Sequence, residues 1–253
     1  MLEYVEKQGG KSARSPGRYC NEVLNSCLSA HDVNAMSTLQ TVVNEIMDAR
    51  SSISSERSVL TAITGIDASG KGYFTERLVG ALQTKGVCAV AINVDAWLNL
   101  PNDRFDASNP AEHYYHNAIR FEEMFAQTIF PLRDHRSLRI EINYADETAT
   151  EYRRRIYEFE DVDVIALEGI YLLKRAFQAH YDRSIWIECS FETALERAVS
   201  RAQEGLPPEE TIRDYRTIYI PAQEIHFQRD NPKGAATCMV NNDARLGPVI
   251  WSK

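Results

Sequence analysis

The residues Gly65-Ile66-Asp67-Ala68-Ser69-Gly70-Lys71-Gly72 are the segment of this chain with the clearest chemical meaning. They match the phosphate-binding pattern G-x-x-x-x-G-K-[ST] at every specified position except the last. In such loops, successive backbone N–H groups and the lysine ammonium surround the oxygens of a phosphate. The last position normally offers a hydroxyl to Mg²⁺, and here it is Gly72. The segment therefore predicts a phosphate site with an unusual metal environment.

The flanking residues favour the same interpretation. Residues 58–64 are β-branched and apolar, as in a strand that runs into the glycines. Phe74, Leu78 and Leu82 follow helical spacing, so a helix begins where the loop ends. The alternative is an ordinary glycine-rich turn, whereas a dinucleotide-binding G-x-G-x-x-G loop is disfavoured because position 67 is not glycine. We expect the nucleotide phosphates to contact Gly65, Asp67, Ala68, Ser69, Gly70, Lys71, Gly72 and Tyr73.

Two carboxylates follow apolar strand-like runs further along the chain. Asp95 comes directly after residues 87–94, and Glu168 comes after residues 162–167. Ligands of open parallel sheets bind beyond the carboxyl ends of the strands, so both acids are expected to face the phosphate loop. There Asp95 would accept the proton of a substrate hydroxyl that attacks the γ-phosphate, and Glu168 would hold Mg²⁺ directly or through water. The alternatives are a turn or N-cap role for Asp95 and a salt bridge for Glu168.

Together these motifs resemble the uridine kinase and phosphoribulokinase family of P-loop kinases. The resemblance covers roughly residues 58–243 and rests on the phosphate loop, the Val-Asp-Ala-Trp around Asp95 and the Ala-Leu-Glu-Gly-Ile around Glu168. It implies ATP- and Mg²⁺-dependent phosphorylation of a hydroxyl on a small molecule. In that family the residue that matches Asp95 is the base and contacts the sugar, the residue that matches Glu168 serves magnesium, and a mobile lid contributes arginines.

The corresponding lid is predicted within residues 192–215. Arg197 and Arg201 lie one helical turn apart there, so their guanidinium groups could clamp the transferring phosphoryl group. Arg197 is assigned to catalysis and Arg201 to the nucleotide. The alternative is a solvated helix face on which both arginines pair with neighbouring glutamates. Residues 206–208 are Leu-Pro-Pro where family members often carry a further arginine, so the lid is abbreviated or rearranged.

The acceptor is less clearly encoded. Asp67 and Asp95 are expected to contact it, and Arg104, Arg120 and Tyr144 are further candidates, although either arginine could equally be a solvated side chain. The pyrimidine nucleoside kinases of the family carry a histidine ahead of the Leu-Glu-Gly strand, and residues 143–150 contain none. A site that reads a base by buried hydrogen bonds loses discrimination when a partner is missing. The candidate acceptors therefore include sugar phosphates, pantothenate and glycerate as well as uridine and cytidine.

These residues need a scaffold of alternating strands and helices. Strands are predicted at residues 58–64, 87–94, 138–144, 162–167, 184–189 and 237–240. Helical patterns precede the first strand at residues 39–47 and recur at about residues 111–130, 172–181, 191–203 and 208–227. The alternation predicts an α/β fold of the P-loop NTPase type. It would be a doubly wound, mostly parallel sheet with helices on both faces and a small helical lid.

The bulk composition fits a soluble globular protein. The chain has 253 residues, 44% of them hydrophobic, which supports one large core; we assign it to residues 34–253. Residues 1–33 are rich in Gly and Ser and are predicted to be a flexible extension, with a basic docking tail as the alternative. The net charge of −8 argues against nucleic-acid and membrane partners.

The cellular location is also predicted from absences in the sequence. Five cysteines form no C-x-x-C pair, and the N-terminus does not resemble a secretory signal. No apolar run is long enough to span a bilayer. A cytoplasmic protein is expected, and a homo-oligomer is possible.

The leading hypothesis is thus an ATP- and Mg²⁺-dependent small-molecule kinase, most like a uridine or cytidine kinase. Magnesium would be held mainly by ATP, Glu168 and waters, and Thr75 is a weaker substitute for the missing hydroxyl because it lies a helical turn beyond Gly72. The alternative from another class is a nucleotide-binding regulatory protein without turnover, suggested by Gly72 and the altered lid.

Overall fold

The computed structural model describes residues 30–202, 205–246 and 250–252. The chain divides into a unit of Met1–Met36 and a unit of Ser37–Lys253. In the first unit only residues 30–36 are described, and they begin helix α1 (Ala30–Ser52). Most of the predicted extension, residues 1–29, lies outside the described residues. Within the described part of the chain, no helix has the length and apolar character required to cross a bilayer.

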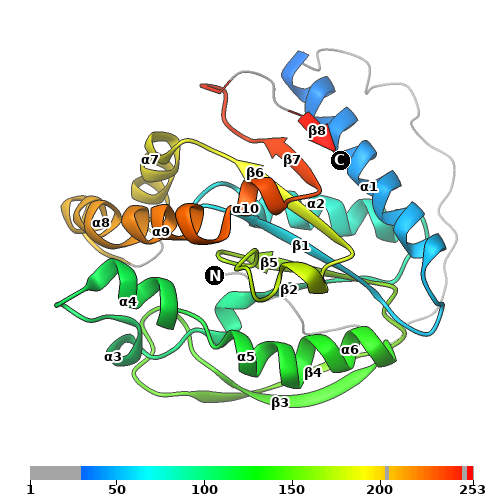
Figure 1. Cartoon of the computed structure of the whole chain (residues 1–253), viewed down its shortest axis with the longest axis horizontal. Coiled ribbons are helices and arrows are strands. Elements are labelled where there is room, and N and C mark those ends of the chain that lie inside the picture. The colour runs from blue at the N-terminus through cyan, green and yellow to red at the C-terminus, as the bar shows by residue number, and fades with distance from the viewer. Residues whose placement is uncertain (1–29, 203–204, 247–249, 253) are drawn as a thin grey trace, which may run out of the picture. The chain divides into compact units, whose positions relative to one another are not determined.

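A six-stranded sheet forms the centre of the second unit (Figure 1). Its strands lie in the order β2 (Ala89–Asn93), β5 (Val164–Gly169), β1 (Val59–Gly65), β6 (Arg183–Glu188), β7 (Cys238–Asn241) and β8 (Ile250–Ser252). The first five are parallel, and β8 runs antiparallel to β7. The predicted doubly wound, mostly parallel sheet is confirmed. The connection after β1 leads to β2 on one side of the sheet, whereas the connection after β5 leads to β6 on the other side. This reversal creates a switch point at the carboxyl ends of the neighbouring strands β5 and β1.

Alternate residues of the buried strand β1 serve two cores. Val59 and Ile63 pack with apolar residues of α1 and of α2 (Lys71–Thr84), whereas Leu60 and Ala62 pack on the opposite face. On that opposite face, α4 (Pro110–Asn117) and the helical stretch of α5 (Phe121–Met124), η2 (Phe125–Ile129) and α6 (Phe130–His135) contribute to the same core as Leu60. The period of two along the strand therefore explains helices on both faces of the sheet.

Five further helical elements follow β6 in the described part of the chain. They are α7 (Phe191–Arg201), α8 (Pro208–Asp214), η4 (Tyr215–Tyr219), α9 (Ile220–Asp230) and α10 (Pro232–Ala235). Ala194 and Ala198 of α7 share a core with Trp186 and Met239 of those strands. The short elements η1 (Val94–Trp97) and α3 (Pro101–Arg104) follow β2. The segment predicted as a lid thus contains α7 and α8.

Two sequence-based expectations about the elements need correction. Residues 138–144 do form a strand, β3 (Leu138–Tyr144), but it pairs with β4 (Arg153–Phe159) in a separate antiparallel hairpin. The helix expected at residues 172–181 is wrong, because only η3 (Gln178–His180) is helical there. Gln178 Nε2 donates to the carbonyl oxygens of Leu173 and Asp230, and such tertiary contacts hold the segment in place of a helical ladder. Apolar residues of this segment are buried against the core, and their spacing along the chain matches that of an amphipathic helix.

The helical pattern at residues 111–130 is also interrupted. The backbone N–H of Asn99 donates to Ala118 O, and that of Arg120 donates to Trp97 O. These bonds pair residues 97–99 with residues 118–120 and occupy backbone groups that a continuous helix would use. The chain consequently turns between α4 and α5, and this turn carries α3 and α4 toward the carboxyl edge of the sheet.

Candidate active site

The phosphate loop lies between β1 and α2 and contains two positions that only glycine can occupy. A Cβ on Gly65 would lie 2.5 Å from Ile187 O, and one on Gly70 would lie 2.1 Å from Asn242 Nδ2. Gly70 also has φ of +93°, a conformation that side chains disfavour. By contrast, a Cβ on Gly72 would meet nothing within 4 Å. The absence of a hydroxyl at Gly72 is therefore not imposed by packing.

Lys71 lies at the start of α2 and is 7% exposed. Its Nζ donates to Ile66 O at 2.9 Å, so the loop curls around the ammonium group. The N-terminal backbone of α2 and Lys71 face the same cavity of about 570 Å³. This combination of loop amides, helix N-terminus and ammonium suits a nucleotide phosphate chain.

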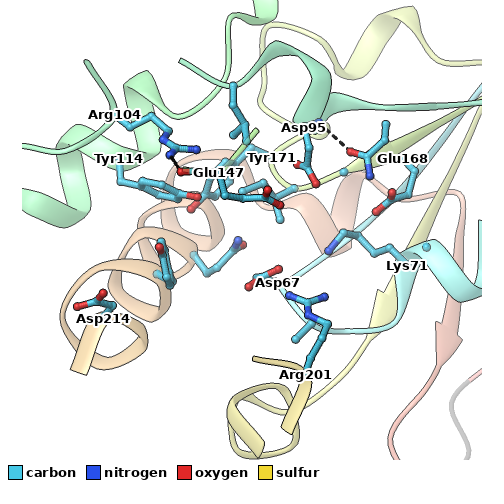
Figure 2. A pocket seen from close by; sticks show the side chains of 18 of the residues that line it. Asp67, Lys71, Asp95, Arg104, Tyr114, Glu147, Glu168, Tyr171, Arg201 and Asp214 are labelled. Atoms are coloured by element: carbon cyan, nitrogen blue, oxygen red, sulfur yellow. Dashed lines mark hydrogen bonds between the residues drawn. The ribbon is translucent and has the colours of Figure 1, made fainter. Parts of the chain in front are cut away.

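The register of the sheet brings the two acids to the loop. Glu168 of β5 is paired with Ile63 of β1 on one side and with Asn93 of β2 on the other. Asp95 follows two residues after Asn93, and its backbone N–H donates to Asn93 Oδ1 at 2.7 Å. Figure 2 shows the side chains of Asp95, Glu168, Lys71 and Asp67 pointing into one space. The expectation that both acids face the phosphate loop thus agrees with this arrangement.

Burial raises the pKa of both acids toward neutrality. The pKa of Asp95 rises to about 6 because the carboxylate is desolvated; the charges of Glu147 and Asp67 raise it further, and Lys71 opposes them. The pKa of Glu168 rises to about 7, again mainly by burial, with Asp95 adding and Lys71 opposing. A cluster of partly neutralised acids beside a phosphate site can bind a cation or accept a proton.

The two lid arginines have different surroundings, although they lie one turn apart on α7. Arg201 lines the cavity, and Figure 2 shows its guanidinium beside Asp67. Arg197 does not line it: Nη1 donates to Ser69 O at 3.2 Å and Nη2 to Asn242 O at 2.7 Å. Arg197 therefore holds the outer side of the phosphate loop. Of the two guanidinium groups, only that of Arg201 belongs to a residue that lines the cavity.

The cavity continues from the acids to a region that we call the acceptor end. It is lined by side chains from several separate segments: Arg104, Phe105, Tyr114, Glu147, Thr148, Tyr171, Tyr219 and Gln223. In Figure 2, Arg104, Tyr114 and Glu147 lie apart from Lys71, with Asp95 and Tyr171 between them. Arg104 is 4% exposed and donates through Nη2 to Glu147 O at 2.5 Å. The suggestion that Arg104 contacts the acceptor is compatible with this position.

Two other acceptor candidates lie outside the residues that line the cavity. Arg120 donates to the carbonyl oxygens of Leu98 and Asn143 and to Glu123 Oε2, so it ties the turn before α5 to β3. Tyr144 packs under the guanidinium of Arg155, whose Cζ lies 5.2 Å from the ring centroid. Both positions indicate structural roles in this arrangement. Asp67 does line the cavity, and its Oδ2 accepts a hydrogen bond from the Tyr215 hydroxyl of η4.

The same cavity is lined by four residues that were not predicted from the sequence: Glu147, Tyr171, Asp214 and Gln223. Glu147 lies between β3 and β4, and Gln223 lies in the middle of α9. No motif marks either position. Tyr171 had a weak signal, since it follows Glu168 by three residues at the end of a buried strand.

The donor set fits ATP and Mg²⁺. Gly70, Lys71 and the first amides of α2 provide a cradle for phosphates, and Glu168 is a buried carboxylate at its edge. Among the described residues, no three His, Cys, Asp or Glu side chains gather closely enough to hold a metal by themselves. A metal ion at Glu168 would therefore need oxygens from the nucleotide and water. Thr75 is buried and does not line the cavity.

The fold of this chain is similar to the folds of several solved structures. One is described as a possible uridine kinase from Bacillus stearothermophilus: TM-score 0.62, 16% identity, covering 81% of this chain and 98% of that one. A D-glycerate 3-kinase from Cryptococcus neoformans gives a TM-score of 0.59 at 12% identity over 86% of this chain and 98% of that one. The chain therefore shares the α/β fold of these solved structures, with the phosphate loop between β1 and α2. No protein-family model matches it, and no curated protein matches it in sequence. The shared fold confirms the α/β architecture that the sequence resemblance implied, and the chemistry rests on the side chains of the site.

Proposed function

We propose that the protein is an ATP- and Mg²⁺-dependent kinase that transfers the γ-phosphate to a hydroxyl of a small molecule, as a uridine or cytidine kinase does. The observation that carries the proposal is the convergence of Lys71, Asp95 and Glu168 at one edge of the sheet, around the phosphate loop. A protein that only bound a nucleotide would need neither a base nor a metal ligand at these strand ends.

Each side chain has a distinct role in this proposal. Lys71 and the loop amides bind the phosphates and neutralise part of their charge. Asp95 accepts the proton of the attacking hydroxyl, and its pKa of about 6 leaves it largely ionised at neutral pH. Arg201 contacts the transferring phosphoryl group from the lid, which replaces Arg197 of the sequence-based hypothesis in that role. Arg197 keeps the loop in shape.

Glu168 would hold the magnesium ion together with ATP and water. When bound, the ion would neutralise charge on the phosphates and help to orient them. The cation would also favour the ionised form of Glu168, because an opposite charge nearby lowers the pKa of a carboxyl.

The deciding experiment is an assay of ADP release with ATP, Mg²⁺ and a panel of nucleosides, sugars, sugar phosphates, pantothenate and glycerate. Production of ADP that depends on one acceptor supports a kinase and identifies its substrate. Nucleotide binding is measured in parallel by calorimetry. If no compound releases ADP, this measurement distinguishes a sample that does not bind ATP from a panel that lacks the true acceptor.

A second candidate is a nucleotide-binding regulatory protein that has lost turnover. Gly72 favours it, since the hydroxyl that normally contacts magnesium is absent. This candidate would be supported if the protein bound ATP tightly and released no ADP with any acceptor. Turnover that disappears in Asp95→Asn would exclude it.

A further inference from the structure

Three buried polar side chains at the acceptor end have atoms without hydrogen-bond partners. They are Gln223, whose amide nitrogen and oxygen are both unpaired, Tyr171 through its hydroxyl, and Arg104 through Nε. These residues are 2%, 1% and 4% exposed, and all three line the cavity. A buried unpaired polar group destabilises a protein by about 1–3 kcal/mol, so native structures usually satisfy it. Their common location indicates that a ligand satisfies them.

The surrounding contacts place Gln223 and Tyr171 near one another. Gln223 lies on α9 between Tyr219, four residues earlier, and His226, three residues later, so the three share a helix face. Tyr219 packs on Tyr114 with ring centroids 5.0 Å apart, and His226 packs on Tyr171 at 5.3 Å. Tyr114 and Tyr171 also contact each other, at 6.4 Å. Gln223 therefore shares a helix face with two members of an aromatic cluster, Tyr219 and His226, which contact the rings of Tyr114 and Tyr171, respectively.

The backbone of Tyr171 supports a functional reason for its position. Its φ is +59°, which is unusual for a bulky residue and strains the backbone. Tyr171, which follows Glu168 by three residues, adopts this conformation in the cavity wall, and its hydroxyl is unpaired.

The charges at this end disfavour an anionic ligand. The cavity is lined by three cations, Lys71, Arg104 and Arg201, and by five carboxylates, Asp67, Asp95, Glu147, Glu168 and Asp214. Lys71 and Arg201 belong to the nucleotide end. Among the described residues that line the cavity, Arg104 is then the one cation at the acceptor end. It already donates to Glu147 O, and its Cζ lies 5.3 Å from the centroid of the Phe105 ring. Arg213 Nε pairs with Asp214 Oδ1 at 3.1 Å and offsets that charge, so a phosphate ester or a carboxylate would be repelled mainly by Glu147 and Asp95.

We propose that the acceptor is an uncharged polyhydroxyl compound, and that the Gln223 amide and the Tyr171 hydroxyl bind its hydroxyl groups. An amide can donate to one hydroxyl oxygen and accept from a neighbouring hydroxyl, so both of its unpaired atoms are used. The aromatic cluster packs against the carbon skeleton. This inference rests on the proposed kinase function. Gln223 and Tyr171 become the residues that select the acceptor.

The experiment measures binding and turnover separately. Thermal unfolding of the full chain is followed with pentoses, hexoses, alditols and nucleosides, then with their monophosphates and with hydroxy acids. At least one neutral compound should raise the melting temperature, and it should also release ADP in the presence of ATP and Mg²⁺. In Gln223→Leu, the dissociation constant of that compound should rise about tenfold or more while ATP binding is unchanged. Without ligand, Gln223→Leu should be at least as stable as the native chain, because two unpaired buried atoms are removed.

Thr128→Val is the matched control. Thr128 is fully buried with an unpaired Oγ1, but it lies in η2 and does not line the cavity. It should leave the acceptor affinity unchanged. The inference is overturned if no neutral compound binds, if a phosphate ester or hydroxy acid is the acceptor, or if Gln223→Leu binds the neutral compound as tightly as the native chain. Binding of a neutral compound through Gln223 without ADP release would instead overturn the kinase function.

Discussion

The nucleotide end and the acceptor end of one cavity are encoded in different ways. The nucleotide end comes mainly from one contiguous loop, residues 65–72, and from two acids at or just after the ends of neighbouring strands, with Arg201 added from α7. The acceptor end is assembled from α3, α4, the β3–β4 connection, the segment after β5, and α9. Phosphate binding uses backbone amides and is thus local, whereas acceptor recognition uses side chains that only folding brings together. Variants at the nucleotide end test this division, in order of expected effect.

Asp95→Asn should produce the largest change. It removes the proposed proton acceptor but keeps the shape of the side chain, so kcat should fall about 10²–10⁴-fold with little change in ATP affinity. Steady-state ADP release and calorimetric titration with ATP measure the two quantities. Undiminished turnover would remove Asp95 from the mechanism and leave the nucleotide end without its base.

The two arginines of α7 provide a matched pair. Arg197→Ala should lower the free energy of unfolding by about 1–3 kcal/mol and weaken ATP binding, because Asn242 O loses its donor and Ser69 O keeps only the bond from Asn242 Nδ2. Arg201→Ala removes an exposed side chain, so stability should change by less than about 0.5 kcal/mol while kcat falls about 10²-fold. Denaturant unfolding and turnover assays compare them. Equal losses of stability would contradict the assignment of only Arg197 to the loop.

Glu168→Gln should show a pH-dependent gain in stability without ligands. The pKa of Glu168 rises from 4.5 in the unfolded chain to about 7 in the fold, so between these values the folded state holds a proton that the unfolded state has released. Stability of the native chain therefore falls as pH rises through this window. The variant has no carboxyl group to titrate at this position, so it lacks this loss and gains about 1–3 kcal/mol relative to the native chain between pH 5 and pH 8. Unfolding curves of the variant and the native chain at both pH values measure the gain. The same difference in stability at both pH values would argue against a raised pKa of Glu168.

Gly72→Ser should have the smallest effect. The new side chain has room, since a Cβ there meets nothing within 4 Å, and stability should change by no more than about 0.5 kcal/mol. The added hydroxyl should lower the Mg²⁺ concentration for half-maximal activity, which a magnesium titration of ADP release measures. An unchanged requirement would mean that the hydroxyl cannot reach the ion.

The sequence predicted the scaffold of the nucleotide end well for a physical reason. The glycines, Lys71 and the strand-terminal acids obey rules of backbone conformation and strand direction that act over a few residues. Patterns based on burial were less reliable. Residues 172–181 have the apolar spacing of a helix, yet they form an irregular, partly exposed segment with tertiary hydrogen bonds.

The arginine pair shows where local reasoning stops. Arg197 and Arg201 share a helix face in sequence, but Arg201 is the last residue of α7, and Ala202 leaves the helix with φ of +44°. The side chain of Arg201 lines the cavity, whereas Arg197, one turn earlier, is held by the loop and Asn242.

The sequence by itself determined that this chain carries a phosphate loop, two acids at strand ends and an alternating α/β scaffold, because each follows from local chirality, glycine conformation and periodicity. Only the tertiary structure decided which arginine lines the cavity. It also placed Arg120 and Tyr144 outside the lining and brought Gln223, Tyr171 and Glu147 into it. Those residues come from segments far apart in the chain, and their chemistry depends on burial and on neighbouring charges that no local pattern contains.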